Sequence, residues 1–146
     1  GIYKLTHKNT NLCLEAANNS DQPGANVQQN TDNGTDSQRW VITLESDGLY
    51  KLKHKGTDQC LEADSGSTQP EANLQQGIDN GSDAQHWNME LMTDGYFKIT
   101  HKGTNQCVDI DQNSNAPLAN AWQYTDNGTD GQRWKLELIE APIISG

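Results

Sequence analysis

The chain lacks long hydrophobic runs and the paired cysteines that stabilise many small proteins. No stretch of its 146 residues approaches the roughly 18 consecutive apolar residues of a membrane-spanning helix. It has three cysteines, an odd number with no Cys-x-x-Cys spacing, which indicates neither a disulfide framework nor a metal cluster. We therefore expect three reduced thiols at half-buried strand positions, namely Cys13, Cys60 and Cys107.

Basic residues are also scarce. Lys and Arg number 10 against 20 Asp and Glu, so the formal net charge is −10. A surface of this sign repels phosphate backbones and anionic lipid, which makes nucleic acid, membranes and polyanionic substrates poor partners. A neutral or a cationic ligand is not disfavoured in this way.

Apolar residues make up only 32% of the chain, and the mean hydropathy is −0.89. Four Trp, four Tyr and regularly placed Leu, Val and Ile nevertheless distinguish it from a disordered sequence of about one domain in length. The chain starts at Gly1 without an initiating Met or a signal peptide. We therefore expect a module excised from a longer precursor, with residues 141–146 as a linker to another domain.

Internal repetition organises the sequence. Aromatic, cysteine and tryptophan positions recur every 47 residues without a gap, at Tyr3, Tyr50 and Phe97, at Cys13, Cys60 and Cys107, and at Trp40, Trp87 and Trp134. The three repeats span about residues 3–49, 50–96 and 97–140, which together form one predicted domain of residues 1–140.

The sequence pattern of each repeat predicts four short strands and no helix. In the first repeat, residues 3–7 alternate apolar and polar side chains, and segments 13–16, 26–29 and 40–44 follow between polar turns. A three-unit solenoid would need capping repeats, and propellers usually have four or more blades. Closure around a threefold axis removes the exposed ends. We therefore expect an all-β fold, a β-trefoil of three 47-residue repeats with pseudo-threefold symmetry.

A Gln-x-Trp triplet stands near the end of each repeat, a few residues after an Asp-Asn-Gly turn: Gln38-Arg39-Trp40, Gln85-His86-Trp87 and Gln132-Arg133-Trp134. With the Cys-Leu-Glu type of strand upstream, this pattern resembles the ricin B-type lectin domain, a family that includes β-trefoil modules attached to bacterial glycoside hydrolases. The resemblance covers nearly the whole chain, from about Ile2 to Leu138.

The resemblance implies one shallow sugar pocket in each repeat. A carboxylate on the second strand accepts hydrogen bonds from two sugar hydroxyls, and an aromatic near the end of the third strand stacks on the sugar. The matching carboxylates are Glu15, Glu62 and Asp109, and the matching stacking positions are Asn30, Gly77 and Tyr124. A polar position before the triplet falls on Ser37, Ala84 and Gly131, where the family usually has Asn. These departures argue against standard galactose recognition.

The triplet residues have structural roles in this interpretation. The Trp residues belong to the core, and Gln38, Gln85 and Gln132 tie the preceding turn to the strands, with a sugar contact as a secondary role. Two residues before each stacking position, on the same strand face, stand Gln28, Gln75 and Trp122. Because Trp122 and Tyr124 break the symmetry with large rings, we predict that the third repeat holds the strongest site. The first two repeats bind weakly through Glu and Gln, or use aromatics from neighbouring loops.

Two further triplicate patterns have a metal-binding alternative. A His ends the first strand of each repeat, at His7, His54 and His101, which favours a structural role over a metal on the threefold axis. The Asp-Asn-Gly turns lack the spacing of an EF-hand calcium loop, and turn formation explains them. The lysines after each His are expected to be solvated. We predict no metal and no cofactor.

The sequence thus predicts a non-catalytic carbohydrate-binding module or lectin with up to three sites. It would be secreted, monomeric and attached to a catalytic domain, which it tethers to a neutral polysaccharide such as a β-linked glucan or galactan. An enzyme is disfavoured because the three carboxylates should lie on separate lobes, too far apart to cooperate. Two alternatives remain, a protein-interaction β-trefoil and a free-standing lectin acting in recognition or toxicity.

Overall fold

Twelve β-strands make up the regular structure of the computed structural model, which describes residues 1–142. They are β1 (Ile2–His7), β2 (Cys13–Ala16), β3 (Val27–Asn30), β4 (Trp40–Leu44), β5 (Tyr50–His54), β6 (Cys60–Ala63), β7 (Leu74–Gly77), β8 (Trp87–Leu91), β9 (Phe97–His101), β10 (Gln106–Ile110), β11 (Ala121–Thr125) and β12 (Trp134–Glu140). Each repeat adds two three-residue 3-10 turns, one after its second strand and one before its fourth. Among the described residues, no helix has the length and apolar character needed to cross a membrane.

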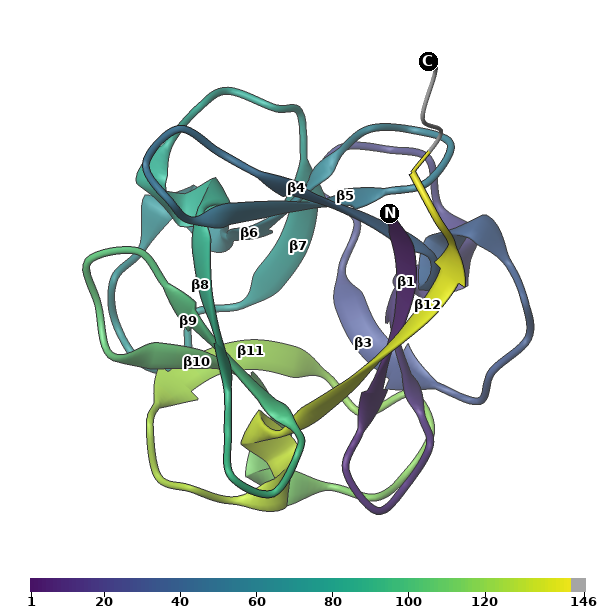
Figure 1. Ribbon diagram of the computed structural model, residues 1–146, viewed down its shortest axis with the longest axis vertical. Coiled ribbons are helices and arrows are strands. Elements are labelled where there is room, and N and C mark those ends of the chain that lie inside the picture. The colour runs from purple at the N-terminus through teal and green to yellow at the C-terminus, as the bar shows by residue number, and fades with distance from the viewer. Residues whose placement is uncertain (143–146) are drawn as a thin grey trace.

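Six strands close into a barrel. Each of β1, β4, β5, β8, β9 and β12 pairs antiparallel with two others of this set, and the ring is completed where β1 meets β12 with Leu5 opposite Leu136. Figure 1 shows this ring surrounded by three lobes. The first and last strands of the chain therefore lie side by side, and no barrel strand leaves an open edge. The prediction of an all-β β-trefoil is confirmed.

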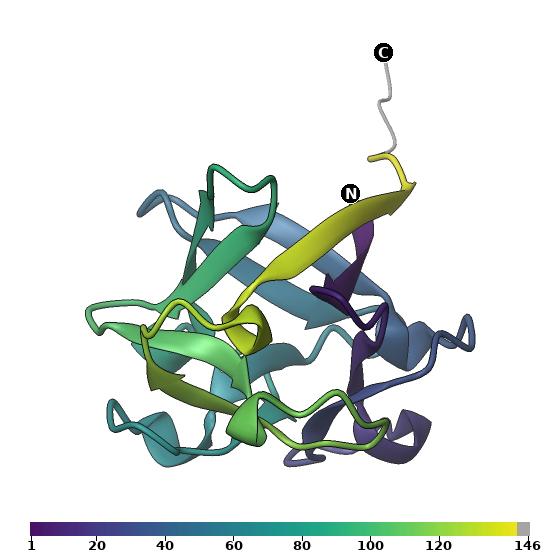
Figure 2. The same ribbon diagram turned by 90° about the horizontal axis from the view of Figure 1, so that it is seen from below.

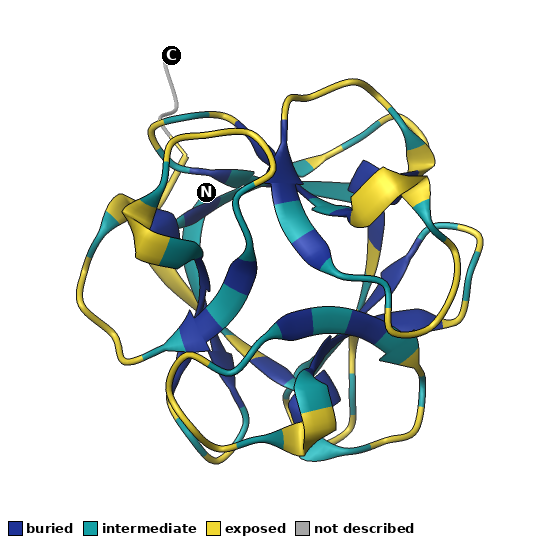
Figure 3. Cartoon of the chain, turned by 180° about the vertical axis from the view of Figure 1, so that it is seen from behind, coloured by how far each residue is buried: buried dark blue, intermediate teal, exposed yellow. Residues whose placement is uncertain are grey.

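The second and third strands of each repeat form a hairpin that lies outside the barrel, one in each lobe. The hairpins β2–β3, β6–β7 and β10–β11 have the same register, which places Glu15 opposite Gln28, Glu62 opposite Gln75 and Asp109 opposite Trp122. Figure 2 shows the hairpin layer on one side of the barrel, and the N-terminus and the end of β12 on the other. In Figure 3 the hairpin strands are largely buried, while the loops around them are exposed.

The three triplet tryptophans form the centre of the core, as expected. Trp40, Trp87 and Trp134 are fully buried, and each indole N–H donates to a backbone oxygen of its own hairpin, at Leu14, Leu61 and Val108 over 3.0–3.1 Å. Each Trp also packs against a His from the next strand in the ring, for example Trp40 against His54. The cores of the three lobes are thereby locked to one another through the barrel.

The cysteines are more deeply buried than the sequence predicted. Cys13, Cys60 and Cys107 are free thiols with no exposed surface, rather than half-buried strand residues. Burial raises the pKa of each thiol to about 12, because the thiolate would lose its hydration. They behave as small apolar core residues.

A fully buried glutamine on the third strand joins each repeat to its neighbour. Gln123 donates through Nε2 to the carbonyls of Ser67 and Gln69, in the loop of the second repeat, and its Oε1 lies 2.9 Å from His101 Nδ1. Gln29 and Gln76 make the equivalent contacts. We call the loops held in this way the cross-repeat loops, residues 20–25, 67–72 and 114–119.

A ring of asparagines closes the same layer on the threefold axis. Asn26 donates to Asn120, Asn120 to Asn73, and Asn73 to Asn26, over 2.7–2.8 Å. Each amide both donates and accepts within the ring, so the three cross-repeat loops are fixed relative to one another.

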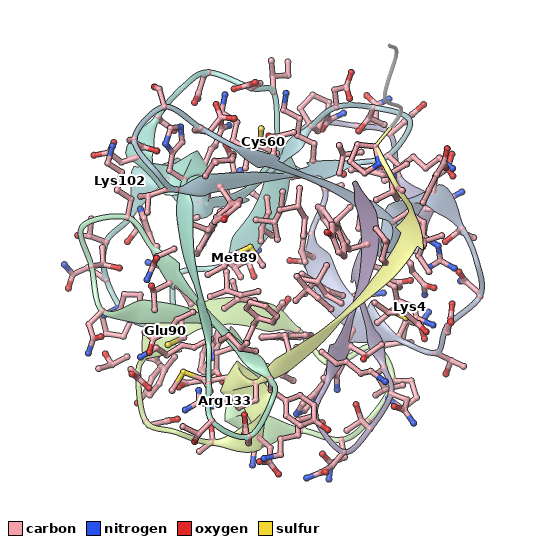
Figure 4. The ribbon with its side chains drawn as sticks, in the orientation of Figure 1. Lys4, Cys60, Met89, Glu90, Lys102 and Arg133 are labelled. Atoms are coloured by element: carbon pink, nitrogen blue, oxygen red, sulfur yellow. The ribbon has the colours of Figure 1, made fainter. Side chains whose placement is uncertain are left out.

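The opposite end of the barrel is apolar. A hollow of about 230 Å³ there is lined by Tyr3, Ile42, Tyr50, Met89, Phe97 and Leu136. Figure 4 shows Met89 near the middle of the ring of strands, whereas Lys102 lies at the periphery. Lys8 and Lys102 are not simply solvated, because they form ion pairs with Asp94 and Asp47 of other repeats at 3.0 and 2.9 Å.

Candidate functional site

Each hairpin carries one acidic side chain that is almost enclosed. Glu15 is 3% exposed and Asp109 is 5% exposed, whereas Glu62 is half-buried. Within the described part of the chain, none of the three takes part in an ion pair. Enclosed carboxylates without a cationic partner need hydrogen-bond donors, and the hairpins supply them.

The first donor comes from the residue directly opposite on the third strand. Gln28 Nε2 donates to Glu15 over 2.7 Å, and Gln75 Nε2 donates to Glu62 over 2.8 Å. In the third repeat the indole Nε1 of Trp122 donates to Asp109 Oδ2 over 2.7 Å. The residues predicted to line the pockets therefore hold the carboxylates in place.

The second donor is the glutamine of the triplet, and it reaches only two of the acids. Gln38 and Gln85 donate to Glu15 and Glu62 over 2.9 and 2.8 Å. Gln132 keeps only its bonds to its own turn, where it donates to the Thr125 carbonyl and accepts from the Asn127 N–H. Aspartate is one methylene shorter than glutamate, which explains the difference. All three amides are fully buried and brace their turns, and Gln38 and Gln85 also support the carboxylates of Glu15 and Glu62.

The stacking positions differ in all three repeats. Asn30 accepts a bond from the backbone N–H of Thr31. A Cβ added at Gly77 would overlap the carboxylate of Glu62, so this acid fills the space that a side chain would occupy. Tyr124 stacks against Trp122, with ring centroids 5.6 Å apart and planes inclined by 14°. The third repeat alone combines an acid with two aromatic rings.

The position before each triplet glutamine is buried and shapes the third site. Ser37 and Ala84 place small side chains there. At Gly131 an added Cβ would lie 3.1 Å from Asp109 Oδ1, and the Gly131 N–H donates to Asn113 Oδ1 over 2.7 Å. Because Gly131 has no side chain, space remains beside Asp109 Oδ1, and no side chain of the described residues donates to this oxygen.

These features meet in a hollow of about 370 Å³ on the third lobe. Its lining consists of Glu71, Asp109, Gln112, Asn113, Trp122, Tyr124, Asn127 and Thr129. The hollow has a carboxylate at its base and an aromatic pair in its wall, two groups that suit the hydroxyls and the C–H face of a sugar ring.

Glu71 is the residue that sequence reasoning missed, because it belongs to the second repeat. It sits in a cross-repeat loop, where its backbone N–H donates to the Gln123 carbonyl over 2.8 Å. Its equivalents at the 47-residue spacing are Gly24 and Leu118, and all three have positive φ, between 70° and 84°. A glycine in one repeat at this spacing was the available signal for an unusual turn.

The family of the chain follows from comparison with known proteins. A family model described as the ricin-type β-trefoil lectin domain-like family matches residues 1–77 and 83–142. The chain belongs to this family. A search of curated protein sequences found no match.

Several solved structures are similar in fold to this ricin-type trefoil. A designed threefold-symmetric protein, ThreeFoil, is 33% identical with a TM-score of 0.89, covering 92% of this chain and 96% of its own. An exo-β-1,3-galactanase from Clostridium thermocellum is 30% identical with a TM-score of 0.90, over 94% of this chain and 30% of its own. The Rhizoctonia solani agglutinin shares the fold at 20% identity and a TM-score of 0.84, covering 93% of both chains.

The third carboxylate of this ricin-type trefoil titrates unusually. Burial raises the pKa of Asp109 to about 6, and the hydrogen bond from Trp122 opposes this by stabilising the ionised form. Near neutral pH Asp109 is therefore ionised, but it takes up a proton in mildly acidic solution.

The triplicate His and Asp residues of the ricin-type trefoil have structural partners. His7, His54 and His101 each contact the buried Gln of their own repeat, and the turn aspartates Asp32, Asp79 and Asp126 pair with Lys4, Lys51 and Lys98. Among the described residues, no group of three or more His, Cys, Asp or Glu is placed to hold a metal ion.

Proposed function

We propose that this protein is a non-catalytic carbohydrate-binding module whose principal site is the hollow of the third repeat. The observation that carries the proposal is the Oδ1 of Asp109, which has no side-chain donor among the described residues, beside the stacked pair of Trp122 and Tyr124. An ionised carboxylate accepts hydrogen bonds from two neighbouring hydroxyls, and an aromatic face covers the C–H side of the ring.

The other two repeats offer weaker sites in this proposal. Both oxygens of Glu15 and of Glu62 already accept a bond from a glutamine, so a sugar hydroxyl must share or displace these donors. Weak sites on one rigid body still add affinity for a polymer that reaches several of them.

The biological setting of the proposal is attachment to a secreted enzyme. The galactanase relative corresponds to this chain over only 30% of its length, which supports a module that accompanies a catalytic domain. A neutral β-linked glucan or galactan suits the net charge of −10 better than an anionic glycan does. Residues 141–146, of which 143–146 lie outside the described part, would be the linker in a monomeric module.

Catalysis by the three repeat carboxylates has little support. Glu15, Glu62 and Asp109 belong to β2, β6 and β10, in three different lobes, and each is bonded within its own repeat (Figure 1). A glycosidase needs two carboxylates on either side of one bond, about 5–10 Å apart.

Affinity electrophoresis in gels containing neutral polysaccharides tests the proposal. We expect retardation of the native protein by at least one β-linked glucan or galactan, and loss of most of it in Asp109→Asn, which keeps the size of the side chain. Glu62→Gln is the matched control, and its effect should be the smaller of the two. Competition by simple sugars distinguishes this function from a protein-interaction trefoil. Absence of retardation across neutral glycans, or release of reducing sugar from them, would contradict the proposal.

A further inference from the structure

The third hollow is built by two repeats, and the second repeat contributes an acid. Glu71 lies in the cross-repeat loop 67–72, which Gln123 holds through the carbonyls of Ser67 and Gln69. The Glu71 backbone is fixed as well, because its N–H donates to the Gln123 carbonyl over 2.8 Å. Since Gln123 stands between Trp122 and Tyr124 on β11, the same residue sets the position of Glu71 and of the aromatic wall.

The charge of this hollow is not compensated. Its lining contains the carboxylates of Glu71 and Asp109 and neither Lys, Arg nor His. In the described part of the chain neither acid forms an ion pair. Asp109 is only 5% exposed, and its Oδ1 has no side-chain donor among the described residues. Two carboxylates that line one hollow, the enclosed Asp109 and the exposed Glu71, attract a cation more strongly than a single acid does.

We propose that the hollow of the third repeat selects a hexosamine with a free, protonated amino group over its N-acetylated or neutral counterpart, with Asp109 and Glu71 as the counter-charges. The inference rests on the sugar-binding function proposed above and deepens it. The faces of Trp122 and Tyr124 add to the attraction, because aromatic faces favour a nearby cation. A neutral sugar, which has a hydroxyl in place of the amino group, can donate the same hydrogen bond but gains no attraction between opposite charges.

The other two repeats serve as internal comparisons. In the loop that contacts the first hairpin, the position of Glu71 is taken by Leu118, whose N–H donates to the Gln29 carbonyl. In the loop that contacts the second hairpin it is taken by Gly24, whose N–H donates to the Gln76 carbonyl. All three residues have a positive φ and make the same backbone hydrogen bond, so Leu and Gly are both compatible with this turn. Only the third lobe therefore has a second carboxylate at this place, and only it should prefer the amino sugar.

The test uses the Trp122 indole N–H as a reporter in nuclear magnetic resonance titrations of the whole chain at about pH 7, where Asp109 is ionised and a sugar amine is still largely protonated. Galactose, N-acetylgalactosamine and galactosamine are compared, with the gluco series in parallel. We expect the amino sugar of at least one series to bind about fivefold to tenfold more tightly than its two counterparts, and this ratio to shrink as salt screens the charges.

Glu71→Gln should bring the ratio close to one, and Glu71→Leu, which copies Leu118, should do the same. Leu118→Glu is the matched control, because it adds a carboxylate beside the first lobe and should leave the ratio at Trp122 as in the native protein. Equal affinities for the three sugars in the native protein, or an unchanged ratio in both Glu71 variants, would overturn the inference and leave the proposed function intact. No response of Trp122 to any sugar would instead count against the proposed function itself.

Discussion

Trp122 contributes both a donor and a ring to the third site, and two substitutions separate these contributions. The indole N–H donates to Asp109 Oδ2 over 2.7 Å, and the ring stacks on Tyr124. Trp122→Phe keeps an aromatic ring and removes the donor. Trp122→Gln removes the ring and keeps a donor of the kind that Gln28 and Gln75 supply in the other repeats.

The donor governs the pH dependence of binding. Native affinity should fall as the pH drops through about 6, where Asp109 takes up a proton and accepts hydroxyl bonds less well. A hydrogen bond to a charged group contributes about 1.5–3 kcal/mol, equivalent to about one to two pKa units. Because this bond stabilises the ionised form, Trp122→Phe should move the midpoint upward by that amount, with much of the affinity recovered in mildly alkaline solution.

The ring governs affinity at every pH. Covering a large aromatic face is equivalent to about 2 kcal/mol, so Trp122→Gln should weaken binding by roughly 30-fold while the midpoint stays near that of the native protein. Isothermal titration calorimetry over a pH series, with an oligosaccharide retained in affinity gels, measures both quantities. Gln28→Ala is the control in the first repeat, and its loss should be the smaller. Coincident pH midpoints for the native protein and Trp122→Phe would refute the role given to the indole donor.

Two further predictions concern the fold around the sites. Gln123→Leu removes the amide that binds the Ser67 and Gln69 carbonyls and His101, so the free energy of unfolding in urea should fall by about 2–5 kcal/mol. The exposed Gln69→Leu should change it by less than about 0.5 kcal/mol, and equal effects of the two would contradict the proposed bracing. Gly77→Tyr should lower the melting temperature because Glu62 occupies the space of its Cβ, and adding Glu62→Asp should restore it, as Asp109 accompanies Tyr124. If Gly77→Tyr alone were as stable as the native protein, this packing of Glu62 against Gly77 would be contradicted.

The sequence predicted the fold well because symmetry and periodicity carry it. The 47-residue spacing defined the repeats, and the polar turns on either side located segments 13–16 and 40–44 at the bounds that the structure has. The third strand begins and ends one residue later than expected, at Val27 and Asn30, because Asn26 belongs to the asparagine ring on the axis.

The site was predictable only in its outline. The carboxylates and the ring pair follow from a motif within one repeat, whereas Glu71 enters from another repeat through a loop whose course depends on tertiary hydrogen bonds. The missing bond between Gln132 and Asp109 reflects one methylene of side-chain length, and the use of the Gly77 space by Glu62 reflects packing across two strands. Such contacts cannot be predicted from residue spacing, because they depend on how side chains of different strands and repeats pack in three dimensions.

The cross-repeat loops have a consequence for the modularity of the chain. A 47-residue unit is the period of the sequence, but a binding site is assembled from the hairpin of one unit and the loop of the unit before it. A single 47-residue unit moved into a relative would therefore bring the hairpin of one site and the cross-repeat loop of another, and neither site would be complete. A segment that carries a complete site would instead begin in one cross-repeat loop and end after the hairpin of the next repeat.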